Sequence, residues 1–147
     1  MLKSRLGSFE ELNVLDLFAG SGALGLEALS RGAASCLFVE QESTAVKAIR
    51  ANIDALDARK RATVQQASVL SLGPAKGAHE LILLDPPYDT GAGKVALDRI
   101  LRLGWIGAST WIALETHLKE DVAIKGLRIE AERKVGKAKL TLLRLDT

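Results

Sequence analysis

The stretch Val14-Leu15-Asp16-Leu17-Phe18-Ala19-Gly20-Ser21-Gly22-Ala23-Leu24-Gly25 decides the fold of this chain. It begins as a short apolar run and continues as G-x-G-x-x-G, with glycines at positions 20, 22 and 25. A glycine loop between a strand and a helix is typical of a nucleotide-binding βαβ unit. The stretch therefore predicts a strand over residues 14–17, a loop, and a helix over residues 23–30.

Short apolar runs and longer helical patterns alternate along the rest of the chain. Further strands are predicted at residues 35–39, 62–66, 81–84 and 110–114, and further helices at 43–53 and 94–103. This alternation is typical of an α/β fold, in which helices cover both faces of a parallel sheet. Residues 127–135 and 139–145 flank Gly136-Lys137-Ala138, which predicts a hairpin and an antiparallel end to the sheet.

The composition fits a single domain with a substantial core, because 48% of the 147 residues are hydrophobic. A net charge of +2 does not by itself indicate a polyanionic partner. Cys36 has apolar neighbours and is expected to be buried, while His79 and His117 stand apart, so no metal site is predicted. We expect a cytoplasmic protein without membrane contact, because no apolar stretch approaches the ~20 residues of a membrane span.

Two carboxylates flank the glycine loop. Glu40 ends the second predicted strand, 20 residues beyond Gly20, where it can accept hydrogen bonds from both hydroxyls of a ribose. The same spacing serves dinucleotides, so the motif alone does not separate a nicotinamide cofactor from S-adenosylmethionine. Asp16 precedes the loop, where it would repel a pyrophosphate and attract an ammonium and a sulfonium. The pair therefore favours S-adenosylmethionine, although each carboxylate also has a purely structural interpretation.

The sequence Asp85-Pro86-Pro87-Tyr88 follows the apolar run 81–84 directly. The two prolines remove two backbone donors and fix the turn, so the carboxylate of Asp85 and the carbonyl of Pro86 remain as acceptors. Tyr88 offers a flat face on which a base can stack. This set is complementary to an exocyclic amine on a nucleobase, although a simple turn at the end of a strand has the same sequence. A methyl sulfonium opposite such a clamp predicts methyl transfer to the amine.

These motifs resemble one known family. Residues 14–33, Phe38-Val39-Glu40 and Asp85-Pro86-Pro87-Tyr88 are similar to those of the bacterial 16S ribosomal RNA guanine-N2 methyltransferases, often labelled N6-adenine-specific methylases. The resemblance implies a class I, Rossmann-like methyltransferase fold with a mostly parallel seven-stranded sheet, ordered 3-2-1-4-5-7-6 with strand 7 antiparallel. It also implies methylation of guanine N2 in small-subunit ribosomal RNA, with that RNA or an assembly particle as partner.

The resemblance also assigns roles to individual residues. The target amine would be held by Asp85, Pro86 and Tyr88. The cofactor would be held by a larger set from four segments: Asp16, Phe18, Ala19, Gly20, Ser21, Gly22, Glu40, Gln41, Ser68 and Asp85.

Two features depart from the family pattern. Family members carry an acid after the third strand that bonds the adenine amine, whereas residues 65–69 offer only Ser68 or a backbone carbonyl. Family members also begin with a basic segment and hairpin that help to bind RNA. Residues 2–6 align with the helix that follows this segment, so we expect the sequence to be N-terminally truncated.

Other interpretations remain open from the sequence. The same clamp suits an adenine-N6 DNA methylase, and a protein that binds the cofactor on a ribosome assembly intermediate without turnover would keep the same motifs. A nicotinamide dehydrogenase is disfavoured by Asp16. Other residues are expected to have simpler roles. Gly91 and Gly93 would form a hinge or a flexible connection, Glu115 would be a structural acid after the fifth strand, and Trp105 and Trp111 would lie in the core. A set of basic residues would form a solvated or RNA-binding face: Lys47, Arg50, 59–61, Arg133, Lys134, Lys137 and Lys139.

Overall fold

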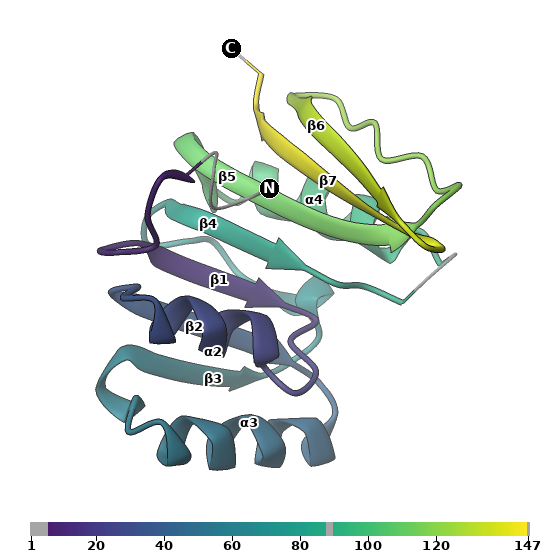
Figure 1. Ribbon diagram of the computed structural model, residues 1–147. Coiled ribbons are helices and arrows are strands. Elements are labelled where there is room, and N and C mark those ends of the chain that lie inside the picture. The colour runs from purple at the N-terminus through teal and green to yellow at the C-terminus, as the bar shows by residue number, and fades with distance from the viewer. Residues whose placement is uncertain (1–5, 88–89, 147) are drawn as a thin grey trace.

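Seven strands form one sheet in the order β3-β2-β1-β4-β5-β7-β6 (Figure 1). The computed structural model describes residues 6–87 and 90–146. The strands are β1 (Asn13–Leu17), β2 (Ser35–Glu40), β3 (Ala62–Gln66), β4 (His79–Leu84), β5 (Ile106–His117), β6 (Leu127–Val135) and β7 (Ala138–Leu145). Strands β1 to β5 pair in parallel, whereas β7 is antiparallel to both β5 and β6. The predicted order and the antiparallel strand 7 are confirmed.

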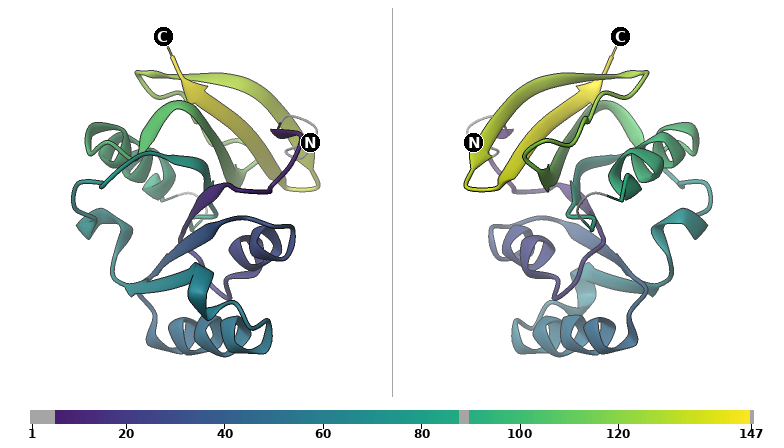
Figure 2. Two further views of the ribbon diagram at one scale, coloured as in Figure 1. Left: turned by 90° about the vertical axis from the view of Figure 1, so that its left-hand side faces the viewer. Right: turned by 90° about the vertical axis from the view of Figure 1, so that its right-hand side faces the viewer.

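Helices cover the two faces of this sheet unequally (Figure 2). The helices α2 (Ala23–Ser30) and α3 (Ser43–Ala55) pack on one face, and α4 (Ala92–Arg102) packs on the other. Two short 3-10 turns, Arg59–Arg61 and Val69–Ser71, precede and follow β3. None of the helices in the described residues is long and apolar enough to cross a membrane.

The central strand β1 is buried on both faces, which is why its sequence lacks a polar alternation. Val14 joins the cluster under α2 and α3, whereas Leu15 and Leu17 join the cluster under α4. Cys36 and Trp105 are buried as expected, and the Trp105 indole N–H donates to the carbonyl of Gly73 at 3.0 Å. The two apolar clusters on the faces of the sheet fix the positions of the strand ends.

Trp111 is only half-buried, so the core prediction holds for it in part. It packs at the edge of the cluster under α2 and α3. The guanidinium of Arg144 lies 4.5 Å from the centroid of its ring.

The predicted bounds of β5 and α4 need correction. β5 runs over the twelve residues Ile106–His117 rather than the five at 110–114. Its start pairs with β4 at His79, and its second half continues along β7, so Glu115 lies within it. α4 begins at Ala92, so Gly93 is buried in its first turn and is not a hinge. A Cβ on Gly93 would lie 3.2 Å from both Pro86 Cγ and Leu114 Cδ1, so the glycine permits close packing of α4 on the strand ends.

The carboxyl ends of β1 to β5 meet at one edge of the sheet, where ligands of open α/β sheets bind. The turn between β6 and β7 reaches the same edge, because the Leu118 N–H after β5 donates to the carbonyl of Lys137 at 2.9 Å. The glycine loop, Glu40, Asp85 and Glu115 therefore share this edge with the hairpin turn (Figure 1).

Candidate active site

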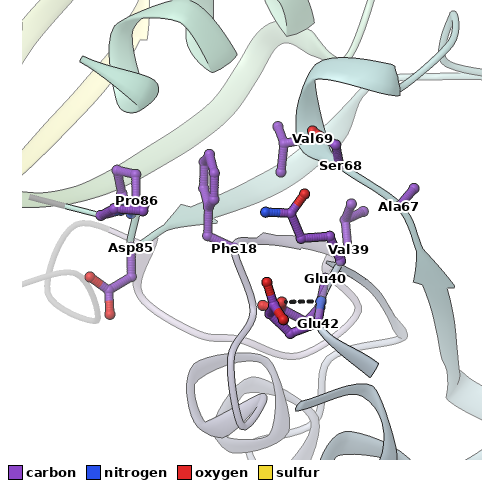
Figure 3. A pocket seen from close by; sticks show the side chains of 11 residues that line it. Phe18, Val39, Glu40, Glu42, Ala67, Ser68, Val69, Asp85 and Pro86 are labelled. Atoms are coloured by element: carbon purple, nitrogen blue, oxygen red, sulfur yellow. Dashed lines mark hydrogen bonds between the residues drawn. The ribbon is translucent and has the colours of Figure 1, made fainter. Parts of the chain in front are cut away.

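A pocket of about 340 Å³ opens at this edge of the sheet, between the ends of β1, β2, β3 and β4 (Figure 3). This volume lies within the range of small-ligand pockets, roughly 300–1,000 Å³. Apolar, acidic and amide side chains line it together: Phe18, Val39, Glu40, Gln41, Glu42, Ala67, Ser68, Val69, Asp85, Pro86 and Pro87.

The glycine loop brings α2 unusually close to the sheet. The Gly22 N–H donates to the carbonyl of Ala19 at 2.8 Å, and Gly22 caps α2 at φ 81°, which favours glycine. A Cβ on Gly25 would lie 2.5 Å from Phe38 Cε1 and 2.9 Å from Asp16 Oδ2. The third glycine of the motif is therefore required by packing, and it brings the start of α2 next to Asp16.

Glu40 fixes the glycine loop to the end of β2. Its Oε1 accepts the Gly20 N–H and its Oε2 accepts the Glu42 N–H, both at 2.8 Å. Each carboxylate oxygen has a second lone pair, so both can still accept a hydroxyl. The carboxylate is half-buried in the pocket wall, in a position suited to a ribose.

Asp16 lies behind the loop and is only 2% exposed. Its Oδ2 accepts the Gly25 N–H at 3.1 Å. Burial, together with the charges of Asp85 and Glu40, raises the pKa of Asp16 to about 7 against the lowering effect of the Gly25 bond. A buried acid whose ionised form is this unfavourable would gain from a cation placed nearby.

Phe18 provides the apolar surface between the two sides of the pocket. In the view of Figure 3 its ring stands between Asp85 and Pro86 on one side and Val69 on the other. Its φ of 56° is in the left-handed region, which is costly for a bulky residue and is often found at functional sites. This backbone turns the chain sharply out of β1 into the loop.

The end of β3 forms the opposite wall. The Ser68 Oγ accepts the Leu70 N–H at 3.2 Å and so caps the turn Val69–Ser71, which leaves its proton able to donate. The Ala67 N–H donates to the carbonyl of Glu40 at 3.0 Å, which joins this wall to β2. The lining here is Ala67, Ser68 and Val69, so no carboxylate is present at the place where the family pattern has one.

The end of β4 carries the residues predicted to form the amine clamp. The side chain of Asp85 is exposed and borders the pocket, while Pro86 is buried against Gly93 of α4. The contact with α4 holds the turn in place. Tyr88 lies outside the described residues, so its role stays a prediction.

Glu115, expected from the sequence to be only a structural acid, is a neighbour of the clamp. It lies on β5 beside Asp85, because Leu114 and Leu84, the residues before them, are paired in the strand register. Burial raises the pKa of Glu115, and the neighbouring carboxylate of Asp85 raises it further. Only the strand register shows that Glu115 and Asp85 are neighbours, and the sequence does not reveal that register.

The structure thus brings most of the predicted site residues to one edge. Six of them line the pocket: Phe18, Glu40, Gln41, Ser68, Asp85 and Pro86. The other described ones form the adjacent loop or lie behind it and do not line the pocket: Asp16, Ala19, Gly20, Ser21 and Gly22. Contact of all these residues with a cofactor stays a prediction.

Residues 1–144 match the model of a family described as conserved hypothetical protein 95. The chain belongs to this family. A relative from Escherichia coli named "Ribosomal RNA small subunit methyltransferase D" is 31% identical over 105 residues, covering 71% of this chain and 53% of that protein. The Bacillus subtilis protein "Putative rRNA methyltransferase YlbH" is 42% identical over 78 residues, covering 50% of this chain and 42% of that protein. The chain thus spans about half the length of the curated relatives it matches.

A solved structure has the same fold as this chain. The protein titled "Putative methyltransferase yhhF from Escherichia coli" superposes with a TM-score of 0.87 and 28% identity, over 99% of this chain and 82% of that one. The fold is that of the class I methyltransferases, as the sequence predicted.

Proposed function

We propose that this protein transfers a methyl group from S-adenosylmethionine to the exocyclic N2 amine of a guanine in small-subunit ribosomal RNA. One observation carries the proposal: Glu40 and the Asp85-Pro86 turn border the same pocket. The acceptor that we assign to the ribose and the clamp that we assign to the amine would therefore lie next to each other. The names of the relatives support ribosomal RNA as the substrate class, and such a substrate implies a cytoplasmic reaction.

The pocket residues suit the parts of this cofactor. Glu40 would accept the ribose hydroxyls, and the apolar surfaces of Phe18 and Val69 would contact the adenine. The Ser68 hydroxyl is the polar group available near the adenine amine. Asp16 would face the cationic methionine end, where its carboxylate would stabilise the ammonium and the sulfonium.

The bound cofactor supplies an activated methyl group on a sulfonium. Asp85 and the Pro86 carbonyl would accept the two N–H groups of the amine, which orients the nitrogen lone pair and stabilises the positive charge that develops there. The nitrogen forms a bond to the methyl carbon as the carbon–sulfur bond breaks, and the extra proton passes to water or to Asp85. Alignment of nitrogen, carbon and sulfur supplies much of the acceleration.

The turn between β6 and β7 supports RNA as the partner. Arg133 and Lys134 at the end of β6 and Lys137 in the turn are exposed, at the edge of the sheet where the pocket opens. Lys139 is different, because it is 8% exposed and its ammonium is bonded to the Glu120 carbonyl at 2.8 Å. The exposed cations can contact RNA phosphates without disturbing the fold.

The test is methyl transfer from labelled S-adenosylmethionine to small-subunit particles, followed by mapping of the methylated nucleoside. We expect N2-methylguanine, and a single-turnover reaction would already exclude a protein that only binds the cofactor. Methyl on adenine N6 of DNA or RNA would refute the guanine assignment. Calorimetry of cofactor binding gives a second measurement, in which Glu40→Ala should abolish binding while Glu27→Gln, on the exposed face of α2, should leave it unchanged.

A further inference from the structure

A second cavity of about 300 Å³ adjoins the amine clamp on the side of α2. It lies between the start of α2, the ends of β4 and β5, and the β6–β7 hairpin. Its walls include Leu24, Leu83, Ala113, Val135 and Leu140, and its polar side chain is Glu115. Leu24 and Val135 are 52% and 61% exposed, so apolar side chains from two different elements form its rim. Such a cavity suits a flat, largely apolar group that has a polar edge.

The strand register brings the two carboxylates of this edge together. Leu84 of β4 pairs with Leu114 of β5, so the next residues, Asp85 and Glu115, are neighbours. Alternate residues point to opposite faces, and Leu83 and Ala113 both lie in the cluster under α2. Asp85 and Glu115 therefore point to the α2 side and lie next to each other. Asp85 borders the first pocket and Glu115 borders the second.

Two carboxylates on neighbouring strands can serve two adjacent donors on one edge of guanine. Neighbouring strands lie about 4.8 Å apart, so two side chains on them can each reach one of two adjacent donors. Guanine presents N1–H beside its N2 amine, and both are donors on the same edge. Adenine presents an unprotonated N1 beside its N6 amine, and that lone pair would face a carboxylate that, when ionised, can only accept.

We propose that the second cavity receives the target guanine, with Asp85 accepting from its N2 amine and Glu115 accepting from its N1–H. This inference rests on the proposed function, and it adds the group that distinguishes guanine from adenine. Leu24 and Val135 contact the faces of the base. The exposed cations of the hairpin turn lie next to the cavity, where the phosphates flanking an extruded base would come.

The test replaces the target guanine, once mapped, by 2-aminopurine in a synthetic RNA. This base keeps the N2 amine but has a lone pair at N1 in place of the N1–H donor. At pH 8 the wild-type protein should prefer guanine over 2-aminopurine in kcat/KM by about 10- to 100-fold. Glu115→Gln should reduce this preference at least about tenfold, because the amide can donate to N1 as well as accept.

Two controls separate selectivity from general damage. Glu27→Gln removes a carboxylate from the exposed face of α2, where it pairs with Arg31, and it should keep the wild-type preference. Glu115→Gln should bind S-adenosylmethionine as tightly as the wild-type protein, which shows that it is folded.

The three failures are distinguishable. If Glu115→Gln slows both RNAs equally and the preference for guanine is unchanged, the inference is overturned while the proposed function stands. If the wild-type protein methylates 2-aminopurine as well as guanine, the role of Glu115 is likewise refuted. If the wild-type protein binds the cofactor and methylates no guanine N2, the proposed function fails and this inference fails with it.

Discussion

Replacing Asp16 with asparagine should make the protein more stable at alkaline pH while weakening the binding of a cationic cofactor. The asparagine oxygen can still accept the Gly25 N–H that Asp16 accepts at 3.1 Å. The side chain keeps its shape and loses its charge. The variant therefore isolates the cost of holding an ionised carboxylate that is 2% exposed.

The magnitude follows from the pKa of Asp16, which rises from 3.8 to about 7 in the folded protein. Because the folded pKa lies above the unfolded one, the folded protein keeps this proton over a pH range in which the unfolded chain has released it. The stability that the proton contributes is complete below about pH 4 and is lost as the pH rises through about 7. About three pH units at ~1.36 kcal/mol each give a loss of about 4 kcal/mol.

The assay is urea unfolding of both proteins between pH 4 and pH 8. The free energy of unfolding of Asp16→Asn, relative to the wild-type protein, should increase by about 4 kcal/mol over that range. Taking the difference cancels the other titrating groups. Asp98→Asn, on the exposed face of α4 where Asp98 pairs with Arg102, is the matched control and should show no such trend.

Calorimetry supplies a second measurement for the same variant. Cofactor binding to the wild-type protein near pH 7 should release a proton from Asp16, and binding to the variant should be weaker and release none. Stability curves of wild type and Asp16→Asn that run parallel from pH 4 to pH 8 would refute the reasoning.

Three further predictions concern the other parts of the site. Glu40→Gln should weaken cofactor binding by about 10- to 100-fold, because the NH2 group that replaces one carboxylate oxygen cannot accept the backbone N–H bonded there at 2.8 Å. Calorimetry showing a change under twofold would contradict this. Gly93→Ala should lower kcat and cost about 1 kcal/mol in urea unfolding with cofactor affinity unchanged, because its Cβ would lie 3.2 Å from Pro86 Cγ. The double variant of Lys134 and Lys137 to alanine should weaken RNA binding and reduce its dependence on log salt concentration by about 1.5; an unchanged slope in a filter-binding titration would show that the hairpin turn is not in contact with RNA.

The sequence predicted those parts of the fold that depend on local patterns. Apolar runs located β1 to β4, and the glycine loop located α2 within a residue of its bounds. The length of β5 could not be predicted, because Glu115 to His117 continue the strand through pairing with β7 rather than through their own apolarity. Gly93 was misread for the same reason, since its role depends on the distant Leu114.

Some residues of the candidate site can likewise be predicted from local patterns, whereas others depend on contacts between distant segments. Glu40 and Asp85 were identifiable because Glu40 ends a strand and Asp85 directly follows one, each within a motif. The burial of Asp16 and the pairing of Glu115 with Asp85 depend on which strands are neighbours, and single-sequence patterns do not contain that information.

The position of β7 between β5 and β6 has a consequence for how this protein is made. The pocket with Glu40 and Asp85 is built from residues up to 87, all of which leave the ribosome before the hairpin does. One edge of β5 remains unpaired until β7 has been synthesised, and β6 cannot join the sheet before that. A nascent chain can therefore complete its first cavity early, while its second cavity and a long strand edge wait for the last strand. During that interval the exposed edge is the most vulnerable point for misassembly between neighbouring nascent chains.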